Sequence, residues 1–213
     1  MDSNWIVIGM GPGEAAYGTA AALEQLRAAE LVCASKPLLQ KYLGLSSTSA
    51  GIVIDGDLAG LKRKLTDWSG RRVAFLVSGD PGFYSILDWL KREFPEARLT
   101  VVPGISSMQL AFARLGQSWY DCKFLSLHGR SGIDLVGELI RNRKVCLLTD
   151  ERSTPATIMA EIAARLPEKR VFIGSRLGTA AEATWQGTAG AYRATDLNHP
   201  YSVVIVEDAE LAL

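Results

Sequence analysis

The feature that most restricts the fold of this chain is the alternation of short apolar runs and helical segments in its first half. Nearly continuous apolar runs are typical of strands that are covered on both faces. Strands joined by helices form parallel sheets, so the pattern indicates an α/β architecture. The predicted strands are 6–9, 31–34, 51–54, 72–79 and 99–104, and the predicted helices are 19–29, 37–43, 58–68, 84–94 and 105–116.

The second half begins with the same alternation and then loses it. Its predicted strands are 123–130, 144–150, 170–177, 182–188 and 201–208, and its predicted helices are 135–141 and 157–165. Because no helix is predicted between the last two strands, a mixed or antiparallel sheet is expected there. We therefore predict two α/β domains, 1–116 with a mostly parallel sheet and 117–213 with a mixed sheet.

Composition argues against several classes of function. The 213 residues include 23 basic and 23 acidic side chains, without the excess of positive charge that is typical of nucleic-acid-binding proteins. No apolar run approaches the ~20 residues of a membrane span, and the N-terminus lacks the basic start of a signal peptide. Cys33, Cys122 and Cys146 are far apart and predict neither a disulfide framework nor a metal site. We expect a cytoplasmic protein that binds no nucleic acid, membrane or metal.

Three glycine-containing turns follow predicted strands: GMGPGE (9–14), SGDPGFYS (78–85) and PGISS (103–107). The first is not a dinucleotide fingerprint, because Glu14 occupies the position of the third glycine. A phosphate-binding loop is also nearly present, but Thr19 replaces its lysine, and Pro12 has no N–H to donate to a phosphate. The first turn therefore suits a ligand without phosphates.

Each turn by itself also fits a purely structural role. Asp80 is a common cap for a following helix, and Ser106 or Ser107 is a common N-cap residue. A binding site is favoured because all three turns are expected at one edge of one sheet, where ligands of open α/β sheets bind. Glycine has no Cβ, so such turns let a bulky ligand approach the backbone.

In combination, VIGMGPGE, VSGDPGFYS and VVPGISSMQLAFARLG resemble the tetrapyrrole methylase family, the class III S-adenosylmethionine (SAM) methyltransferases, over essentially the whole chain. The resemblance implies SAM in a cleft between two α/β domains, and commonly a homodimer. The segments FLSLHGR and VCLLTDERSTPATI are similar to the unfused members that methylate carbon 5 of a precorrin or cobalt-precorrin in cobalamin biosynthesis. Some relatives fuse this unit to a carbon-15 methyltransferase and decarboxylase, so a separate partner of that kind is expected.

The resemblance also implies the residues that contact SAM. Those from the three turns are Pro12, Gly79, Asp80, Phe83, Ser106 and Ser107, and those from the second domain are Thr149 and Gly187, both near the adenine. One segment departs from the family pattern: GTAAEAT (178–184) stands where many relatives have a Pro-Asp-Glu-type stretch.

The implied substrate is a large, flat tetrapyrrole with several carboxylates, which call for arginine and lysine donors. The candidates next to strand ends are Lys36, His128, Arg130, Arg152 and Arg176. Each of these also fits an ordinary surface or structural residue. Methyl transfer mainly requires alignment of the nucleophile, the methyl group and the sulfur, so no Ser-His-Asp machinery is expected. The catalytic base is not identified, and His128 and Asp150 are the candidates.

Two alternatives remain open at the level of sequence. The first keeps the family and changes the acceptor to another precorrin carbon or to uroporphyrinogen. The second is a non-catalytic protein that binds SAM and a tetrapyrrole for a partner methyltransferase.

Overall fold

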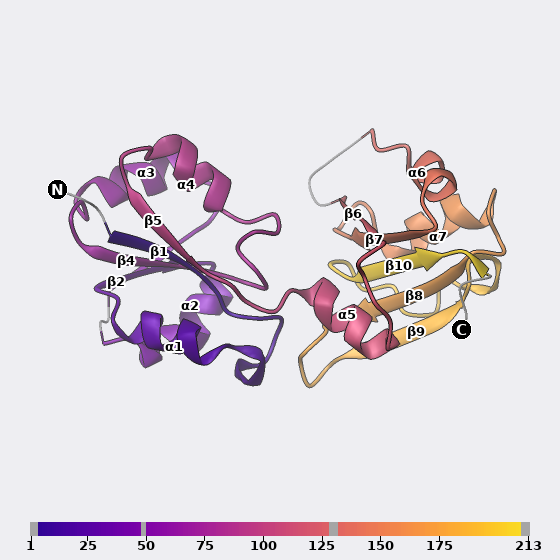
Figure 1. Cartoon of the computed structure of the whole chain (residues 1–213), viewed down its shortest axis with the longest axis horizontal. Coiled ribbons are helices and arrows are strands. Elements are labelled where there is room, and N and C mark those ends of the chain that lie inside the picture. The colour runs from indigo at the N-terminus through magenta and orange to yellow at the C-terminus, as the bar shows by residue number, and fades with distance from the viewer. Residues whose placement is uncertain (1–3, 48–49, 128–131, 210–213) are drawn as a thin grey trace. The chain divides into compact units, whose positions relative to one another are not determined.

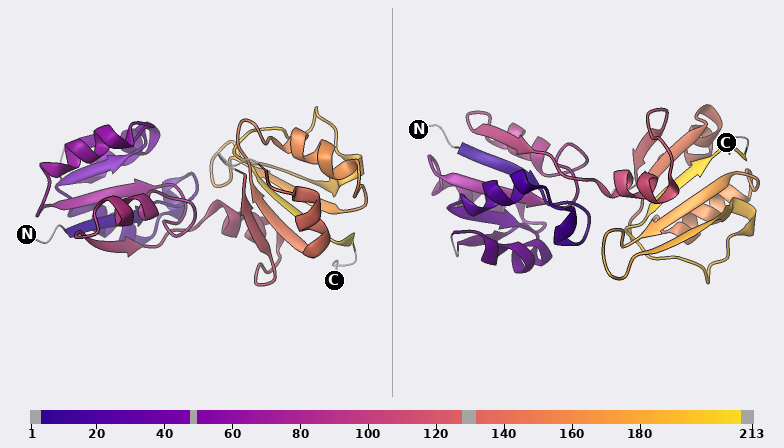
Figure 2. Two further views of the ribbon diagram at one scale, coloured as in Figure 1. Left: turned by 90° about the horizontal axis from the view of Figure 1, so that it is seen from above. Right: turned by 60° about the horizontal axis from the view of Figure 1, so that its bottom comes forward.

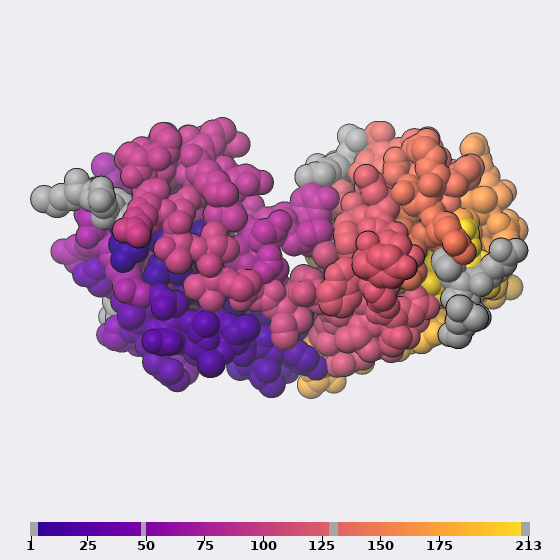
Figure 3. Space-filling view, in the orientation of Figure 1, coloured from indigo at the N-terminus to yellow at the C-terminus, as the bar shows by residue number. Residues whose placement is uncertain are grey.

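Apolar runs become the strands of two separate sheets in the computed structural model, which describes residues 4–47, 50–127 and 132–209 (Figure 1). The chain divides into two units, Met1–Ser106 and Ser107–Leu213. Each sheet is flanked by its own helices (Figure 2), and side chains cover the strands in the space-filling view (Figure 3).

The sheet of the first unit has five strands, all parallel, which confirms the predicted parallel sheet; their order is β3-β2-β4-β1-β5. The strands are β1 (Asn4–Gly9), β2 (Leu31–Ala34), β3 (Gly51–Val53), β4 (Arg72–Val77) and β5 (Arg98–Val102). Because β1 lies between β4 and β5, the carboxyl ends of these three strands are neighbours.

Helices cover both faces of this sheet (Figure 1). They are α1 (Ala20–Arg27), α2 (Lys36–Tyr42), α3 (Leu58–Thr66) and α4 (Leu87–Glu93), with short 3₁₀ turns η1 (Ala15–Tyr17) and η2 (Leu43–Leu45). Alternating side chains of β1 explain the two layers. Ile6 and Ile8 pack with α1 and α2, whereas Trp5 and Val7 pack with α3 and α4.

The second sheet is mixed, also as predicted, with the order β6-β7-β10-β8-β9. Only β6 and β7 pair in parallel, and the other pairs are antiparallel. The strands are β6 (Lys123–Ser126), β7 (Lys144–Leu148), β8 (Arg170–Ser175), β9 (Ala183–Thr188) and β10 (Val203–Glu207).

The helices of the second unit are α5 (Ser107–Leu115), α6 (Leu135–Arg141) and α7 (Pro155–Ala163), with a short 3₁₀ turn η3 (Ala189–Ala191). Helices α6 and α7 bury apolar side chains in one cluster with Val204 and Val206 of β10. Helix α5 packs elsewhere on this sheet, with the Phe112 ring 6.4 Å from that of Phe124 in β6. None of the helices in the described ranges has the length and apolar character needed to cross a bilayer.

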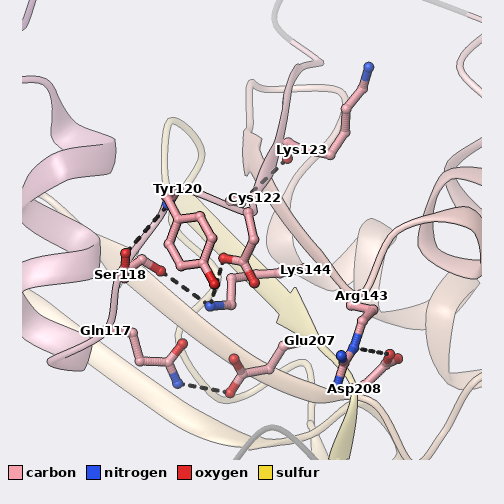
Figure 4. Close-up of polar contacts among 10 residues, drawn as sticks. Gln117, Ser118, Tyr120, Cys122, Lys123, Arg143, Lys144, Glu207 and Asp208 are labelled. Atoms are coloured by element: carbon pink, nitrogen blue, oxygen red, sulfur yellow. Dashed lines mark hydrogen bonds and ion pairs between the residues drawn. The ribbon is translucent and has the colours of Figure 1, made fainter.

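The observed division precedes α5, whereas the predicted domain boundary follows Gly116. The reason is that α5 and the segment after it contact the second sheet. Gln117 Nε2 donates a hydrogen bond to Glu207 Oε1 at 3.1 Å, and Lys144 Nζ donates to the Ser118 carbonyl oxygen at 3.2 Å (Figure 4). Helix α5 therefore belongs to the second unit.

Candidate active site

Three glycines bring the predicted turns together at the carboxyl edge of the first sheet. Gly9 ends β1, Gly79 follows β4 and Gly104 follows β5. A Cβ on Gly9 would lie 2.6 Å from both the Gly104 nitrogen and the Gly79 oxygen, so these backbones are in direct contact. The predicted convergence of the three turns is confirmed, and we refer to Gly9, Gly79 and Gly104 as the glycine junction.

Backbone hydrogen bonds hold the first two turns against each other. The Met10 N–H donates to the Val77 carbonyl oxygen at 2.9 Å, and the Gly79 N–H donates to the Gly11 carbonyl oxygen at 3.0 Å. Gly11 and Gly79 have φ angles of +78° and +72°, which lie in a region that residues with a Cβ rarely adopt. Glycine is therefore required here by the backbone itself.

Asp80 joins the second turn to the third. Its Oδ1 accepts a hydrogen bond from the Gly82 N–H at 2.8 Å, and its Oδ2 accepts one from the Gly104 N–H at 3.0 Å. The alternative role as a helix cap is wrong, because α4 begins at Leu87 with Ile86 at its N-cap. Asp80 thus fixes the backbone that lines the predicted cofactor site.

The first turn is held by helix α2, a contact that the sequence analysis did not predict. Lys41 of α2 donates a hydrogen bond from Nζ to the Gly13 carbonyl oxygen and lies 3.9 Å from the Glu14 carboxylate. Pro12 in this turn is buried. Thr19, at the position of the missing phosphate-binding lysine, caps α1 by accepting a hydrogen bond from the Ala22 N–H at 3.1 Å.

The remaining candidates from the second and third turns, and Lys36, follow the carboxyl ends of strands of the first sheet. Ser106 is buried, and Ser107 is the first residue of α5. Phe83 is half-buried, and its ring centroid lies 4.6 Å from that of Tyr84 in an edge-to-face contact. Lys36 is exposed at the start of α2, directly after the carboxyl end of β2.

In the second unit, Thr149 follows β7 and belongs to a buried hydroxyl network. Its Oγ1 accepts a hydrogen bond from the Ser202 N–H at 2.7 Å and lies 3.1 Å from the Ser202 carbonyl oxygen. The hydroxyls of Ser175 and Ser202 are 2.5 Å apart, and Ser202 Oγ donates to the His199 carbonyl oxygen at 2.6 Å. The network fixes the ends of β7, β8 and β10 relative to one another.

Asp150 is buried and organises the loop before α7. Its Oδ1 accepts hydrogen bonds from the Arg152 and Ser153 N–H groups at 2.9 and 2.7 Å. Arg152 itself is exposed. One oxygen of this candidate base is therefore already engaged in fixing the backbone.

Arg176 directly follows β8, and Tyr201 lies two residues before β10 and forms a hydrogen bond with Glu151 of this loop. Both are exposed, and both have left-handed φ angles, +48° and +60°. Desolvation and the hydrogen-bonded Glu151 carboxylate raise the pKa of Tyr201. Arg176 was predicted from sequence as a substrate contact, whereas the position of Tyr201 next to the Asp150 loop was not.

The structure does not bring Thr149 and Gly187 together. Leu148 of β7 is level with Thr184 of β9 across the two intervening strands. Thr149 is one residue further along, level with Ala183, so Gly187 is displaced from it by roughly 13 Å along the strands and about 14 Å across them, too far for one adenine ring to contact both residues. A Cβ on Gly187 would lie 2.8 Å from the Trp185 ring, which accounts for a glycine here without a ligand.

Two predicted residues, His128 and Arg130, lie outside the described residues. Within the described ranges, no group of three or more histidine, cysteine, aspartate or glutamate side chains is arranged to hold a metal ion. The expectation that the protein binds no metal stays a prediction.

The sequence of this chain matches those of known methyltransferases. Residues 5–192 match the model of the family described as tetrapyrrole (corrin/porphyrin) methylases. The cobalt-precorrin-7 C(5)-methyltransferase of Salmonella typhimurium is 30% identical over 78% of this chain and 81% of its own length. The decarboxylating precorrin-6Y C(5,15)-methyltransferase of a Sinorhizobium species is 32% identical over 71% of this chain and 38% of its own length.

A solved structure has the same fold at low sequence identity. The uroporphyrin-III C-methyltransferase of Thermus thermophilus, complexed with S-adenosylhomocysteine, matches with a TM-score of 0.76 and 18% identity, over 97% of this chain and 98% of its own. The family match covers both units, including the turns of the glycine junction. This chain therefore belongs to the tetrapyrrole methylase family.

Proposed function

We propose that this protein transfers a methyl group from SAM to carbon 5 of a cobalt-precorrin or precorrin in cobalamin biosynthesis. The observation that carries the proposal is the glycine junction, which joins the three predicted cofactor-binding turns at one edge of the sheet, in a chain that is 30% identical to a C(5)-methyltransferase. The substrate class and the carbon are those named for the Salmonella relative.

The residues around the glycine junction fit a nucleoside cofactor without phosphates. Pro12 provides no N–H for a phosphate, and the lysine position of a phosphate-binding loop is occupied by the helix cap Thr19. We assign SAM to the turns after β1, β4 and β5, through Pro12, Gly79, Asp80, Phe83, Ser106 and Ser107. Thr149 remains a proposed cofactor contact. Gly187 is left out because it lies at the end of β9 that is remote from Thr149.

SAM supplies a methyl group on a positively charged sulfur, which an electron-rich carbon can displace directly. The task of the protein is then to hold both reactants in line, and this alignment is the main source of rate enhancement. The glycine junction is suited to that task because Asp80 and the backbone hydrogen bonds leave it little freedom.

Exposed basic side chains are assigned to the carboxylates of the tetrapyrrole. In the described residues these are Lys36, Arg152 and Arg176, and His128 and Arg130 remain in the proposal from sequence alone. Guanidinium groups bind carboxylates through two parallel hydrogen bonds, which orients the macrocycle as well as attracting it. If a base removes a ring proton, the candidates remain His128 and Asp150.

We further propose that the protein acts in the cytoplasm as a homodimer, together with a separate carbon-15 methyltransferase and decarboxylase. The Sinorhizobium relative, whose name includes both C(5) and C(15), supports a partner activity at carbon 15, because the match to this chain spans 38% of that protein. Sedimentation equilibrium of the purified chain tests the dimer, and it predicts twice the monomer mass of 23.1 kDa.

Two measurements on the purified protein test the central proposal. Isothermal titration calorimetry with S-adenosylhomocysteine is expected to show saturable binding to one site per chain. Mass spectrometry after incubation with SAM and cobalt-precorrin-7 is expected to show the gain of one methyl group. Binding without turnover would favour a non-catalytic role, and turnover only of uroporphyrinogen or another precorrin would favour a different member of the family.

A further inference from the structure

Tyr84 has a backbone conformation that is unusual for its type of side chain. Its φ angle is +55°, in the left-handed region where a Cβ crowds the backbone. For an aromatic residue this is a genuine outlier, and such outliers are concentrated at active sites and ligand contacts. Glycine would adopt this conformation without strain, so the tyrosine side chain itself needs an explanation.

The turn that contains Tyr84 is held firmly enough to maintain the strain. Asp80 accepts hydrogen bonds from Gly82 and Gly104, and the Phe83 N–H donates to the Asp80 carbonyl oxygen at 3.1 Å. On the other side, Ser85 Oγ donates to the Pro81 carbonyl oxygen and accepts from the Leu87 N–H at 3.1 Å. Strained residues persist where the surrounding structure fixes them in this way.

Packing within the protein accounts for only part of the Tyr84 side chain. Its ring meets that of Phe83 at 71°, with the centroids 4.6 Å apart, yet 48% of the residue is exposed. An exposed aromatic ring that already contacts a neighbouring ring is a suitable platform for a flat conjugated ligand.

The larger side chains of this turn differ in exposure: Asp80 and Phe83 are half-buried, whereas the Tyr84 ring is exposed. Asp80 and Phe83 are assigned to the cofactor, and an exposed aromatic ring next to them suits the larger, flat acceptor. We infer that Tyr84 stacks against the face of the tetrapyrrole and fixes the position of the macrocycle. This inference rests on the proposed function and names a substrate contact that the sequence motifs did not.

Tyr84→Gly and Tyr84→Phe separate this role from a purely structural one. Glycine removes the ring and relieves the strain, so the variant is expected to fold with an unchanged or higher melting temperature. Uroporphyrin III, a stable carboxylated tetrapyrrole, is the probe, and its binding is followed by absorbance. Tyr84→Gly is expected to weaken uroporphyrin III binding by about tenfold while S-adenosylhomocysteine affinity, measured by calorimetry, stays within about twofold.

Two matched variants complete the experiment. Tyr84→Phe keeps the ring and is expected to bind both ligands as the wild type does. Tyr120, 88% exposed in the second unit, serves as the control, and Tyr120→Ala is expected to change neither affinity. In turnover assays Tyr84→Gly is expected to raise KM for the tetrapyrrole more than KM for SAM, a split that a general loss of folding would not produce.

The outcomes distinguish this inference from the proposed function. Equal uroporphyrin III affinities of wild type and Tyr84→Gly would overturn the role of Tyr84 alone. A loss of S-adenosylhomocysteine affinity as large as the loss of tetrapyrrole affinity would assign the ring to the cofactor and overturn it as well. A wild type that binds uroporphyrin III but no S-adenosylhomocysteine would contradict the proposed function, and one that binds no tetrapyrrole would contradict both.

Discussion

Single residues at the glycine junction show how the site is built from backbone. Gly104 is the most constrained of them, because a Cβ there would lie 2.7 Å from the Gly9 carbonyl carbon and still closer to the Gly79 oxygen. Such distances cannot be relieved by rotating a side chain, since the neighbouring atoms are main chain. The strands β1, β4 and β5 would have to move apart, and with them the surface proposed for SAM.

Gly104→Ala is therefore expected to destabilise the protein by about 1–3 kcal/mol, the usual cost of forcing extra atoms into a packed site. Its affinity for S-adenosylhomocysteine is expected to fall as well, because the junction must widen. Urea unfolding and calorimetry measure the two effects. Gly56→Ala is the control, since a Cβ at Gly56 meets nothing within 4 Å. Equal stability of the two variants would show that the junction is not tightly packed.

Asp80 serves the fold and the proposed site together, since both of its carboxylate oxygens accept backbone N–H groups. Asp80→Asn keeps the size but leaves only one acceptor oxygen, so one N–H would face an amide N–H₂. Hydrogen bonds to charged groups contribute about 1.5–3 kcal/mol, so affinity for S-adenosylhomocysteine is expected to fall at least tenfold, as measured by calorimetry. An unchanged affinity would mean that the link between the second and third turns is not needed to bind the cofactor.

At the scale of elements, sequence periodicity predicted every strand and helix of the described residues, with errors at their ends. The predicted helix from Tyr84 begins at Leu87, because the left-handed Tyr84 cannot start an α-helix. The predicted strand 72–79 ends at Val77, where the chain turns into the glycine junction. These ends depend on contacts between turns that are distant in sequence, which periodicity does not contain.

Helix α5 shows another limit of periodicity. Its apolar face indicates that it is covered, but not by which sheet. The structure joins it to the second unit, where Arg114 forms an ion pair with Glu182 in the segment that departs from the family pattern. Glu182 Oε2 also accepts a hydrogen bond from the Gly178 N–H at 2.7 Å. The GTAAEAT segment therefore acts as an attachment point for α5.

This ion pair predicts a pH dependence of stability. The hydrogen bond from Arg114, followed by that from Gly178, lowers the pKa of Glu182 in the folded protein below its ordinary value of 4.5. The unfolded chain then takes up a proton first on acidification, so the stabilisation is complete above pH 4.5 and is lost as pH falls through the folded pKa.

Glu182→Gln is accordingly expected to be less stable than wild type at pH 7, with a difference that shrinks below pH 4.5. Urea unfolding at a series of pH values measures this difference. Glu24→Gln, at an exposed site in α1, is the control and is expected to show no such convergence. A difference that is independent of pH would rule out the ion pair as its source.

At the scale of the whole molecule, the sequence indicated two α/β units but not how the second sheet is ordered. Thr149 and Gly187 were expected near one ring because the family resemblance implies that both contact the adenine. Strand β9 runs antiparallel to β8, and this places Gly187 level with Val171, near the beginning of β8. Strand direction follows from long-range pairing, so motif spacing alone could not reveal the separation.

The position of the unit boundary makes a prediction for fragments of the chain. A fragment of residues 107–213 keeps α5 and its contacts with β6 and the β8–β9 loop. It is expected to unfold cooperatively, whereas a fragment of residues 117–213 exposes the apolar surface that Phe112 covers and is expected to be less stable or to aggregate. Thermal melts followed by circular dichroism compare the two fragments. Equal melting temperatures would contradict the assignment of α5 to the second unit.

The central claim concerns a methyl group and the carbon that receives it. SAM carrying a ¹³C-labelled methyl group, incubated with the protein and cobalt-precorrin-7, allows the product to be analysed by NMR. We predict one labelled methyl group bonded to carbon 5 of the macrocycle. A label on another carbon, or no incorporation by a protein that binds both S-adenosylhomocysteine and tetrapyrrole, would contradict the assignment of this chain as a C(5)-methyltransferase.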